Sequence, residues 1–318
     1  PKTRNMPEDA PEKWAEYIEY NRQDVVVEKA IRKRLLSLKP PAIEHEYWLL
    51  DQDINWRGVK VDMELVDAAL ACNDEIVEEA TESSKILTGL ENPNSTMQLK
   101  EWLTARLGYD LETMRKDDVS NLLTQDIPSD VRKVLQNRQV LGNSSIKKYL
   151  AMKNAVCSDG RIHGMLQFYG AMRSGRWAGR VVQLQNLPRN YLEDLDTARE
   201  VLKSRDVEML DLLYGNPGDV IKQLIRTALV AEDGHRFIVA DFSAIEARVI
   251  AWLAHEQWRQ DVFAQGGDIY CASASSMFHV PVEKHGVNGH LRQKGKVAEL
   301  ALGYGGGVGA MKAMDTKG

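Results

Sequence analysis

The chain has 318 residues, of which 43% are hydrophobic and 27% are charged, and its formal net charge is −5. This composition is typical of a globular protein with two or three domains and excludes a disordered chain. No apolar run of about 18 residues is present, so we expect no membrane-spanning segment. The three cysteines lack CxxC spacing, which indicates neither a disulfide framework nor a zinc site and favours a reducing, intracellular setting. Because the sequence begins at Pro1, we interpret it as an internal part of a longer chain.

Helical periodicity dominates the first 150 residues, which we expect to form an elongated helical module. Helices are predicted as a pair over residues 7–39, as two stretches over 42–84, from about Thr96 onward, and over 130–155 as one long helix or two. The expected boundaries are Pro40-Pro41, a turn into a short strand at Arg57-Gly58-Val59, a loop at Asn92-Pro93-Asn94-Ser95 and a kink near Gly142.

Sheet structure is predicted to begin around the turn Asp159-Gly160, with strands AVCS before it and RIHGMLQFYG after it. A Gly- and Arg-rich loop over residues 173–190 and an acidic helical stretch over 191–231 follow. Asp233-Gly234 then turns the chain into an apolar strand, FIVAD, at residues 237–241. The last predicted elements are helices over SAIEARVIAWLAHE, about 269–278 and about 290–302, the last of which ends in a glycine cluster.

Charge is distributed unevenly along the chain. Residues 41–130 hold 20 acidic and 7 basic side chains, whereas residues 131–190 hold 11 basic side chains and a single acid. A basic segment of this kind either forms a solvated face or meets an anionic partner. We favour nucleic acid, because Lys and Arg contacts to phosphate release counterions and supply most of the non-specific affinity.

Asp241 ends the predicted strand FIVAD directly before a helix. A lone acid at the end of a buried apolar strand costs desolvation free energy unless a cation or a donor meets it. Asp241 is therefore a candidate magnesium ligand, since Mg²⁺ prefers carboxylate oxygen and keeps positions open for phosphate. The alternative is that Asp241 caps the helix. Ser243 competes for that role, because Ser243 and Glu246 have the spacing of a capping box. Membership in this capping box is also the structural alternative for Glu246.

A second pattern lies near the C-terminus, where Arg292, Lys296, Leu300 and Tyr304 recur every four residues. On a helix this spacing places two cations and an aromatic ring on one face. Such a face suits a nucleoside triphosphate, with Arg and Lys on the phosphates and Tyr near the base. The alternative is a solvated basic helix with Tyr304 in the core. The following glycines form no Walker loop, because no Gly-Lys-Ser/Thr accompanies them.

The Gly- and Arg-rich loop is the third pattern. Its glycines permit a close approach to a duplex, and Gln and Asn can contact minor-groove acceptors that every base pair presents in nearly the same place. Alternatively, these amides satisfy the backbone of the loop. The candidate DNA-binding residues of the loop are Arg176, Arg180, Gln183, Gln185 and Asn186.

These three patterns, in this order, resemble the family A (polymerase I-like) DNA polymerases, most closely their bacteriophage-encoded branch. DFSAIEAR resembles motif A, which implies that Asp241 and the Phe242 carbonyl bind two catalytic Mg²⁺ ions and that Glu246 excludes ribonucleotides. We further expect Arg248 to orient Glu246 or a neighbouring carboxylate. The helix from Arg292 is similar to motif B, which implies that Arg292, Lys296, Leu300 and Tyr304 bind the incoming dNTP and that Lys296 is the general acid.

Weaker resemblances cover most of the remaining chain. SGRWAGRVVQLQNLPRN is similar to the motif that grips the primer–template minor groove, with Arg176 at the primer end. Ser95 and Gln98 match a thumb segment that touches duplex phosphates, and Tyr20 and Asp24 match the last motif of the 3′-to-5′ exonuclease domain. Two departures are present: Leu300 replaces the usual Phe or Tyr, and the second catalytic aspartate would lie beyond residue 318.

The resemblance implies a mixed α/β fold, namely part of a right-hand polymerase with a helical thumb, part of an antiparallel palm sheet and partial helical fingers. The expected domains are an exonuclease remnant (1–38), the thumb (39–150), the first part of the palm (151–250, with a helical insertion at about 191–222) and part of the fingers (251–318). The expected function is template-directed DNA synthesis from dNTPs on primer–template DNA, by a cytoplasmic monomer. The alternative is a catalytically incomplete primer–template-binding fragment. A nuclease built on Tyr20 and Asp24 is disfavoured, since two residues cannot form a two-metal site.

Overall fold

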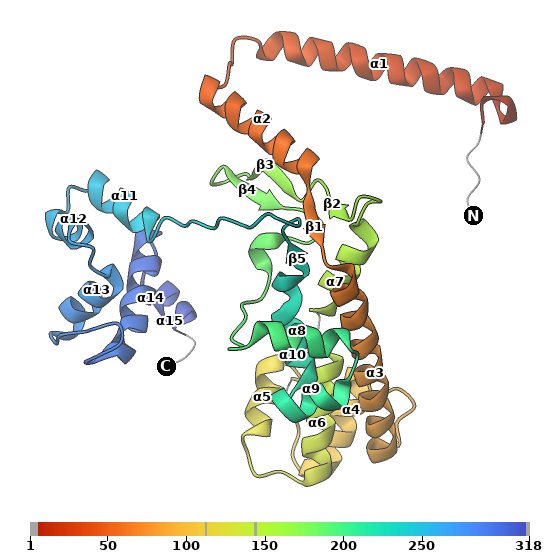
Figure 1. Cartoon of the computed structure of the whole chain (residues 1–318), viewed down its shortest axis with the longest axis vertical. Coiled ribbons are helices and arrows are strands. Elements are labelled where there is room, and N and C mark those ends of the chain that lie inside the picture. Colours follow the sequence, from red (N-terminus) through yellow and green to blue (C-terminus); the bar gives the residue numbers. More distant parts are fainter. Residues whose placement is uncertain (1–5, 112, 143–144, 316–318) are drawn as a thin grey trace. The chain divides into compact units, whose positions relative to one another are not determined.

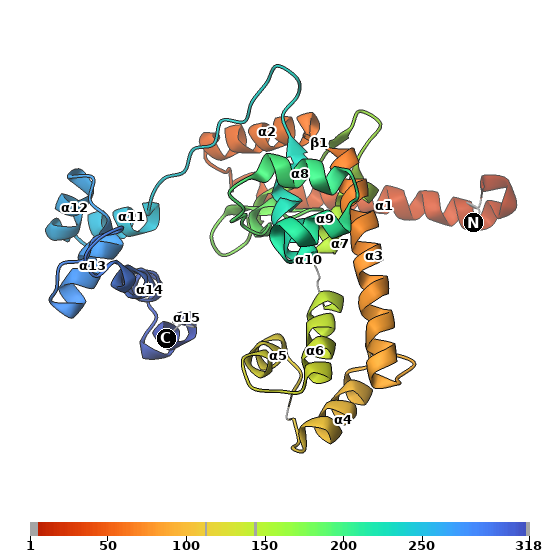
Figure 2. The ribbon, with the colours of Figure 1, turned by 60° about the horizontal axis from the view of Figure 1, so that its bottom comes forward.

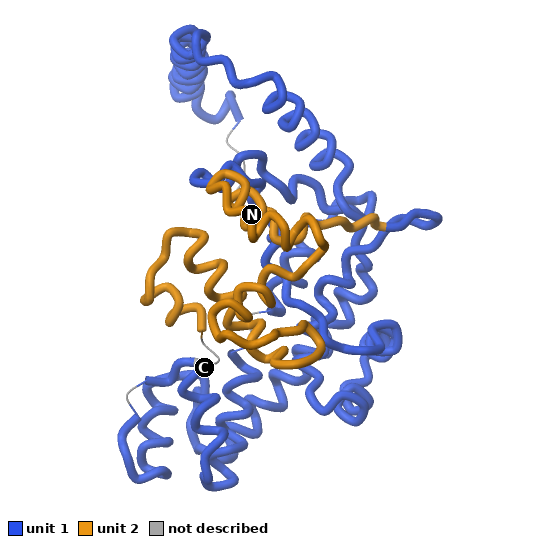
Figure 3. Tube along the Cα trace, turned by 90° about the vertical axis from the view of Figure 1, so that its left-hand side faces the viewer, with its two compact units in different colours: residues 1–236 blue, residues 237–318 orange. Residues whose placement is uncertain are grey.

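The computed structural model describes residues 6–111, 113–142 and 145–315. It divides into two compact units, residues 1–236 and 237–318, which Figure 3 shows in different colours. Helices make up most of both units, and the short strands of the first unit form two antiparallel sheets (Figure 1). The predicted mixed α/β class is therefore confirmed.

The first unit begins with a short 3₁₀ turn, η1 (Pro7–Asp9), and two helices, α1 (Pro11–Leu35) and α2 (Ala42–Arg57). The prediction of a helix pair over residues 7–39 is wrong, because no glycine or proline interrupts the chain between Pro11 and Leu35. Helix α1 buries none of its residues. Helix α2 ends at Gly58, which adopts φ 63° and leads into the predicted short strand.

That strand, β1 (Val59–Val61), lies at the centre of a three-stranded antiparallel sheet in the order β2-β1-β5. Its neighbours are β2 (Arg161–Ile162) and β5 (Leu229–Val230), with Val59 opposite Ile162 and Lys60 opposite Val230. The predicted strand AVCS is wrong: helix α7 runs to Ala155, and a tight turn closes with the Cys157 N–H on the Arg161 carbonyl at 2.8 Å. Strand β5 was not predicted, since two residues carry no periodic signal.

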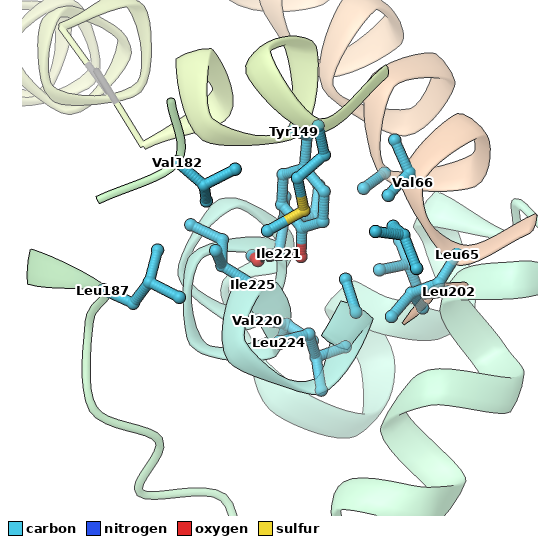
Figure 4. Close-up of a cluster of buried hydrophobic side chains, with 14 of the residues drawn as sticks. Leu65, Val66, Tyr149, Val182, Leu187, Leu202, Val220, Ile221, Leu224 and Ile225 are labelled. Atoms are coloured by element: carbon cyan, nitrogen blue, oxygen red, sulfur yellow. Dashed lines mark hydrogen bonds between the residues drawn. The ribbon is translucent and has the colours of Figure 1, made fainter. Parts of the chain in front are cut away.

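Six helical segments build the main core against this sheet: α3 (Met63–Thr88), α7 (Ile146–Ala155), α8 (Leu195–Lys203), α9 (Val207–Tyr214), α10 (Pro217–Leu224) and η3 (Ile225–Ala228). Figure 4 shows Tyr149 among the aliphatic side chains of this cluster, and its hydroxyl donates to the Ile221 carbonyl at 2.8 Å. Asp62, which caps α3, also accepts hydrogen bonds from Arg199 and Lys203 on α8, at 2.6 and 3.0 Å. The predicted helical segment 191–222 therefore belongs to the core.

A second, smaller core joins α4 (Thr96–Leu107), α5 (Lys116–Leu123) and α6 (Ser129–Leu141). Figure 2 shows α6 beside the C-terminal half of α3, where Asn137 donates to the Ser84 hydroxyl at 3.1 Å. The helix predicted from Thr96 is confirmed. Residues 130–155 form two helices, and residues 143–144, beside the predicted kink, lie outside the described residues.

The predicted loop over residues 173–190 contains a strand, β4 (Arg176–Gly179), which pairs with β3 (Leu166–Ala171) as an antiparallel hairpin. A one-turn 3₁₀ helix, η2 (Leu184–Asn186), follows. The prediction of a loop throughout this stretch is therefore wrong. Glycine and alanine, which end this strand, have low strand propensity, so only the backbone pairing with β3 reveals β4.

The second unit holds α11 (Ile245–Leu253), α12 (Gln257–Ala264), α13 (Ile269–Phe278), η4 (Gly289–Leu291), α14 (Arg292–Gly303) and α15 (Val308–Met314). The predicted buried strand FIVAD is wrong, since residues 237–241 are extended, form no ladder, and expose 86% of Ile238 and 90% of Val239. Apolar side chains alone do not make a strand, because a strand needs a partner backbone. Helix α15 was not predicted, because the glycines before it were interpreted only as the end of α14.

Helices α13 and α14 pack closely at Gly295. A methyl group there would lie 2.1 Å from the Tyr270 carbonyl oxygen and 3.0 Å from both the amide nitrogen and the Cβ of Ala274. Gly295→Ala should destabilise this unit by roughly 1–3 kcal/mol, because overpacking against backbone outweighs a helix-propensity gain of about 1 kcal/mol. Hydrogen exchange of the α13 and α14 peptides measures this.

The matched control is Gly303→Ala on the same helix. Its nearest contact would be the Ile250 Cδ1 atom at an ordinary 3.5 Å, so protection should be unchanged or slightly increased. Equal protection in the two variants would show that the contact at Gly295 is not tight.

The three cysteines are free thiols. Burial raises the pKa of the Cys72 thiol to about 11, and Glu75 adds to this shift. Burial also raises the pKa of Cys271, whereas Cys157 is exposed. We expect iodoacetamide at pH 8 to label Cys157 and spare Cys72, because the thiolate is the reacting species. Mass spectrometry reads the sites, and unfolding in urea should make Cys72 reactive; rapid labelling of native Cys72 would contradict the buried position.

Candidate functional site

Asp241 lies in the extended segment before α11, and its side chain is exposed. It forms no hydrogen bond or ion pair with any residue that the structure describes. The N-cap position of α11 belongs to Ala244, so Asp241 is not the helix cap. Its carboxylate and the neighbouring Phe242 carbonyl remain available as oxygen ligands.

The start of α11 differs from the predicted capping box. Ala244 adopts a left-handed φ of 51° and no side chain caps the helix, so Ser243 lies one residue outside the cap position. The Ser243 carbonyl instead accepts a hydrogen bond from the Arg248 Nε at 2.9 Å, and the Arg248 guanidinium stacks on the Phe263 ring at 4.3 Å. The expectation that Arg248 orients a carboxylate is therefore wrong.

Glu246 is held by a residue far away in the sequence. The Tyr304 hydroxyl donates a hydrogen bond to Glu246 Oε2 across 58 residues, which joins α11 to the C-terminal end of α14. Tyr304 is 65% exposed, so the alternative that places it in the core is wrong. The structure thus brings together two residues that the sequence singled out in separate motifs.

Arg292 is engaged by the cap of the neighbouring helix. Its Nε and Nη2 atoms each lie 2.8 Å from Asp268 Oδ2, and its guanidinium lies 5.1 Å from the centre of the Tyr270 ring. Asp268 Oδ1 accepts from the Tyr270 and Cys271 backbone N–H groups at the start of α13. These two contacts with Asp268 hold the Arg292 guanidinium in one orientation.

Lys296 and Leu300 continue the same helical face, and both are half-buried. Within the part of the chain that the structure describes, the Lys296 ammonium group forms no hydrogen bond or ion pair. An anionic ligand can bind the Lys296 ammonium group without breaking an existing ion pair to a described carboxylate. Leu300 offers an aliphatic surface at the position where the motif that this helix resembles has Phe or Tyr.

Glu299 is a structural residue of this helix that the sequence analysis missed. Its side chain is 6% exposed, and it binds Arg259 on α12 and the Ser273 hydroxyl on α13, the latter at 2.5 Å. Arg259 also pairs with Glu256 at 2.5 Å. Glu299 lies seven residues after Arg292 and therefore shares a helical face with it, and this acid beside two cations was the available signal, because buried acids are usually paired.

The candidate DNA-binding residues of the first unit lie on and after β4. Arg176 and Arg180, which begin and follow the strand, are exposed. Gln183 accepts from Lys148 Nζ at 3.4 Å and from Asn186 Nδ2 at 3.5 Å. A methyl group on Gly179 would lie 2.3 Å from Gln185 Oε1, which shows that Gln185 folds back over the strand. Gln183 and Asn186 therefore contact each other and a lysine rather than satisfying the loop backbone.

Ser95 and Gln98 lie at the start of α4. The Ser95 hydroxyl caps the helix by accepting from the Gln98 N–H at 3.5 Å, and the Gln98 side chain is exposed. Arg138 on α6 donates to the Asn94 carbonyl and to the Thr96 hydroxyl, at 3.4 and 3.2 Å. A capped N-terminus beside an arginine suits a phosphate group.

Tyr20 and Asp24 are exposed one turn apart on α1. Among the described residues, no three His, Cys, Asp or Glu side chains gather into a metal-binding group. Asp241 and the Phe242 carbonyl nevertheless fit Mg²⁺ in kind, because Mg²⁺ is usually held by one or two carboxylates with phosphates and water. None of the described helices is long and apolar enough to cross a bilayer.

This arrangement has the fold of a polymerase domain. A solved structure of the POL domain of Pol1 from M. smegmatis, in complex with DNA primer-template and dNTP, superposes with a TM-score of 0.59 at 22% identity, covering 92% of this chain and 47% of that one. The family model for DNA polymerase family A matches residues 64–314, and the chain belongs to that family.

Relatives with assigned names agree with this membership. The chain is 52% identical over 313 residues to a DNA polymerase of Bacillus phage SP02, which covers 98% of this chain and 48% of that protein. It is also 42% identical over 81 residues to DNA polymerase I of Rhizobium leguminosarum and 35% identical over 109 residues to the thermostable DNA polymerase I of Thermus aquaticus. The chain thus spans about half the length of the phage relative, and the predicted family is confirmed.

Proposed function

We propose that this chain forms part of a template-directed DNA polymerase, which transfers a nucleotidyl group from a dNTP to the 3′-hydroxyl of a primer. The observation that carries the proposal is the hydrogen bond between Tyr304 and Glu246, because it joins the helix that follows Asp241 to the helix that bears Arg292 and Lys296. The Asp241 carboxylate and the Lys296 ammonium group therefore belong to one unit. Neither group has a partner among the described residues.

In the proposed site, Asp241 and the Phe242 carbonyl would hold Mg²⁺, with a second aspartate from another part of the protein completing a two-ion site. The metal would activate the primer hydroxyl and offset the charge of the triphosphate. Arg292, oriented by Asp268, would bind a phosphate, and Lys296 would donate a proton to the leaving pyrophosphate. Leu300 contacts the nucleotide, and Glu246, fixed by Tyr304, occupies the space that a ribose 2′-hydroxyl would need.

Primer–template DNA is the proposed macromolecular partner of the first unit. Arg176, Arg180, Gln183, Gln185 and Asn186 would follow the minor groove, and Ser95 and Gln98 would meet backbone phosphates. We assign residues 1–38 to the end of an exonuclease domain with Tyr20 and Asp24, 39–150 to the thumb, 151–250 to the palm and 251–318 to the fingers. We further propose a cytoplasmic location, because the substrates of replication are found there. We also propose that the protein is a monomer.

The test is primer extension on a labelled primer–template with Mg²⁺ and four dNTPs, by this chain and by the complete gene product. The proposal predicts that both bind the duplex and that the complete product extends the primer. Binding without extension by either protein would favour the alternative of a primer–template-binding fragment. Absence of both binding and extension would overturn the proposal.

A further inference from the structure

The β3–β4 hairpin, which carries Arg176, forms a two-stranded sheet of its own. A two-stranded hairpin is at best marginally stable in water, so contacts from other elements must fix its orientation. Helix α2 lies beside the hairpin in Figure 1, and its side chains supply such contacts. The position of Arg176 therefore depends on α2.

Two polar side chains on α2 bind the two strands of the hairpin. Asn55 uses both ends of its amide on one residue of β3: its Nδ2 donates to the Leu166 carbonyl and its Oδ1 accepts from the Leu166 N–H, each at 2.9 Å. Asp51 Oδ1 accepts from the Trp177 indole N–H on β4 at 2.8 Å. Positions 51 and 55 are one helical turn apart, so a single face of α2 holds both strands.

The hydrogen bond between Asp51 and Trp177 is shielded from water. Asp51 is only 4% exposed, and the Trp177 ring meets Phe168 and Tyr47 edge-on, with centroid distances of 5.4 and 6.1 Å. Gln52 donates a second hydrogen bond to Asp51 at 3.1 Å, and no cation of the described residues forms an ion pair with it. A buried carboxylate without a cation is costly, so its hydrogen bonds define the geometry at this point.

Strand alternation connects this contact to Arg176. Adjacent residues of a strand point to opposite faces, so a Trp177 ring held against α2 turns the Arg176 side chain to the other, exposed face. We propose that the hydrogen bonds between Asp51 and Trp177 and between Asn55 and Leu166, which we call the latch, position Arg176 toward the primer–template. Asp51 is thus a positioning residue that acts through Trp177 and Arg176. This inference rests on the proposed function.

The experiment compares Asp51→Leu with Asp51→Asn in the complete protein. Asp51→Leu removes the acceptor and should raise the KM for primer–template by about tenfold, as expected for a lost hydrogen bond to a charged group, while the KM for dNTP is unchanged. Asp51→Asn keeps an acceptor oxygen and should restore a KM near that of the parent. Should Asp51→Leu fail to fold by circular dichroism, Trp177→Phe, which removes the indole N–H, takes its place and should show the same change.

A double-mutant cycle with Arg176→Ala separates positioning from general destabilisation. If Asp51 acts through Arg176, Asp51→Leu has no further effect on the KM for primer–template in the Arg176→Ala background. An undiminished effect in that background, or a parental KM in Asp51→Leu, overturns the proposal. Fluorescence anisotropy with primer–template gives the same comparison as a dissociation constant. Because anisotropy measures DNA binding alone, it tests the latch even if the complete protein extends no primer. A failure to extend would refute the proposed function and leave the test of the latch intact.

Discussion

Asp241→Ala should abolish Mg²⁺-dependent primer extension by the complete protein. We expect a loss of at least about a thousandfold, because removal of a metal ligand takes away several kcal/mol of transition-state stabilisation. The physical basis is a carboxylate that neither caps α11 nor forms an ion pair among the described residues. Steady-state extension over a range of Mg²⁺ concentrations measures the effect, and anisotropy with primer–template should give an unchanged dissociation constant.

Asp261→Ala is the matched control for this substitution. Asp261 is an exposed acid of the same unit, on α12, and its carboxylate accepts a hydrogen bond from the Gln257 side chain at 2.8 Å. It should extend primers at the parental rate. Persistent extension by Asp241→Ala, or an equal loss in both variants, would refute the assignment of Asp241 as the metal ligand.

Glu299→Ala should destabilise the second unit by about 3–5 kcal/mol, the range for removing one partner of a buried ion pair. The substitution deprives Arg259 and the Ser273 hydroxyl of the acceptor that joins α12, α13 and α14. We expect the α13 and α14 peptides to lose hydrogen-exchange protection, while the peptides of the first unit keep theirs. Glu299→Gln retains an acceptor oxygen and should lose less protection.

Lys294→Ala is the control on the same helix. Its ion pair with Asp315, at 2.7 Å, is about one-third exposed on both sides, and exposed pairs contribute only about 0–1 kcal/mol. Protection should therefore change little. Equal losses in Lys294→Ala and Glu299→Ala would contradict the burial of the Glu299 network.

Local sequence signals located most helices and the residues at their ends. Gly58 and Ser95 stand where the turn into β1 and the start of α4 were predicted, because left-handed φ and helix capping are properties of a few residues. The spacing of Arg292, Lys296, Leu300 and Tyr304 likewise placed them on one helical face. Local signals failed at β4 and at residues 237–241, since strand formation depends on a partner backbone that a local window does not contain.

The sequence by itself determined the family, the motifs, and the chemical groups available for metal, phosphate and DNA, because these follow from residue type and spacing along one chain. Only the tertiary structure decided how those groups are engaged. It paired Glu246 with Tyr304 across 58 residues and Trp177 with Asp51 across 126 residues, and it left Asp241 without a partner among the described residues. The physical reason is that a hydrogen bond between distant residues depends on the packing of whole helices and strands, and no local pattern encodes that packing.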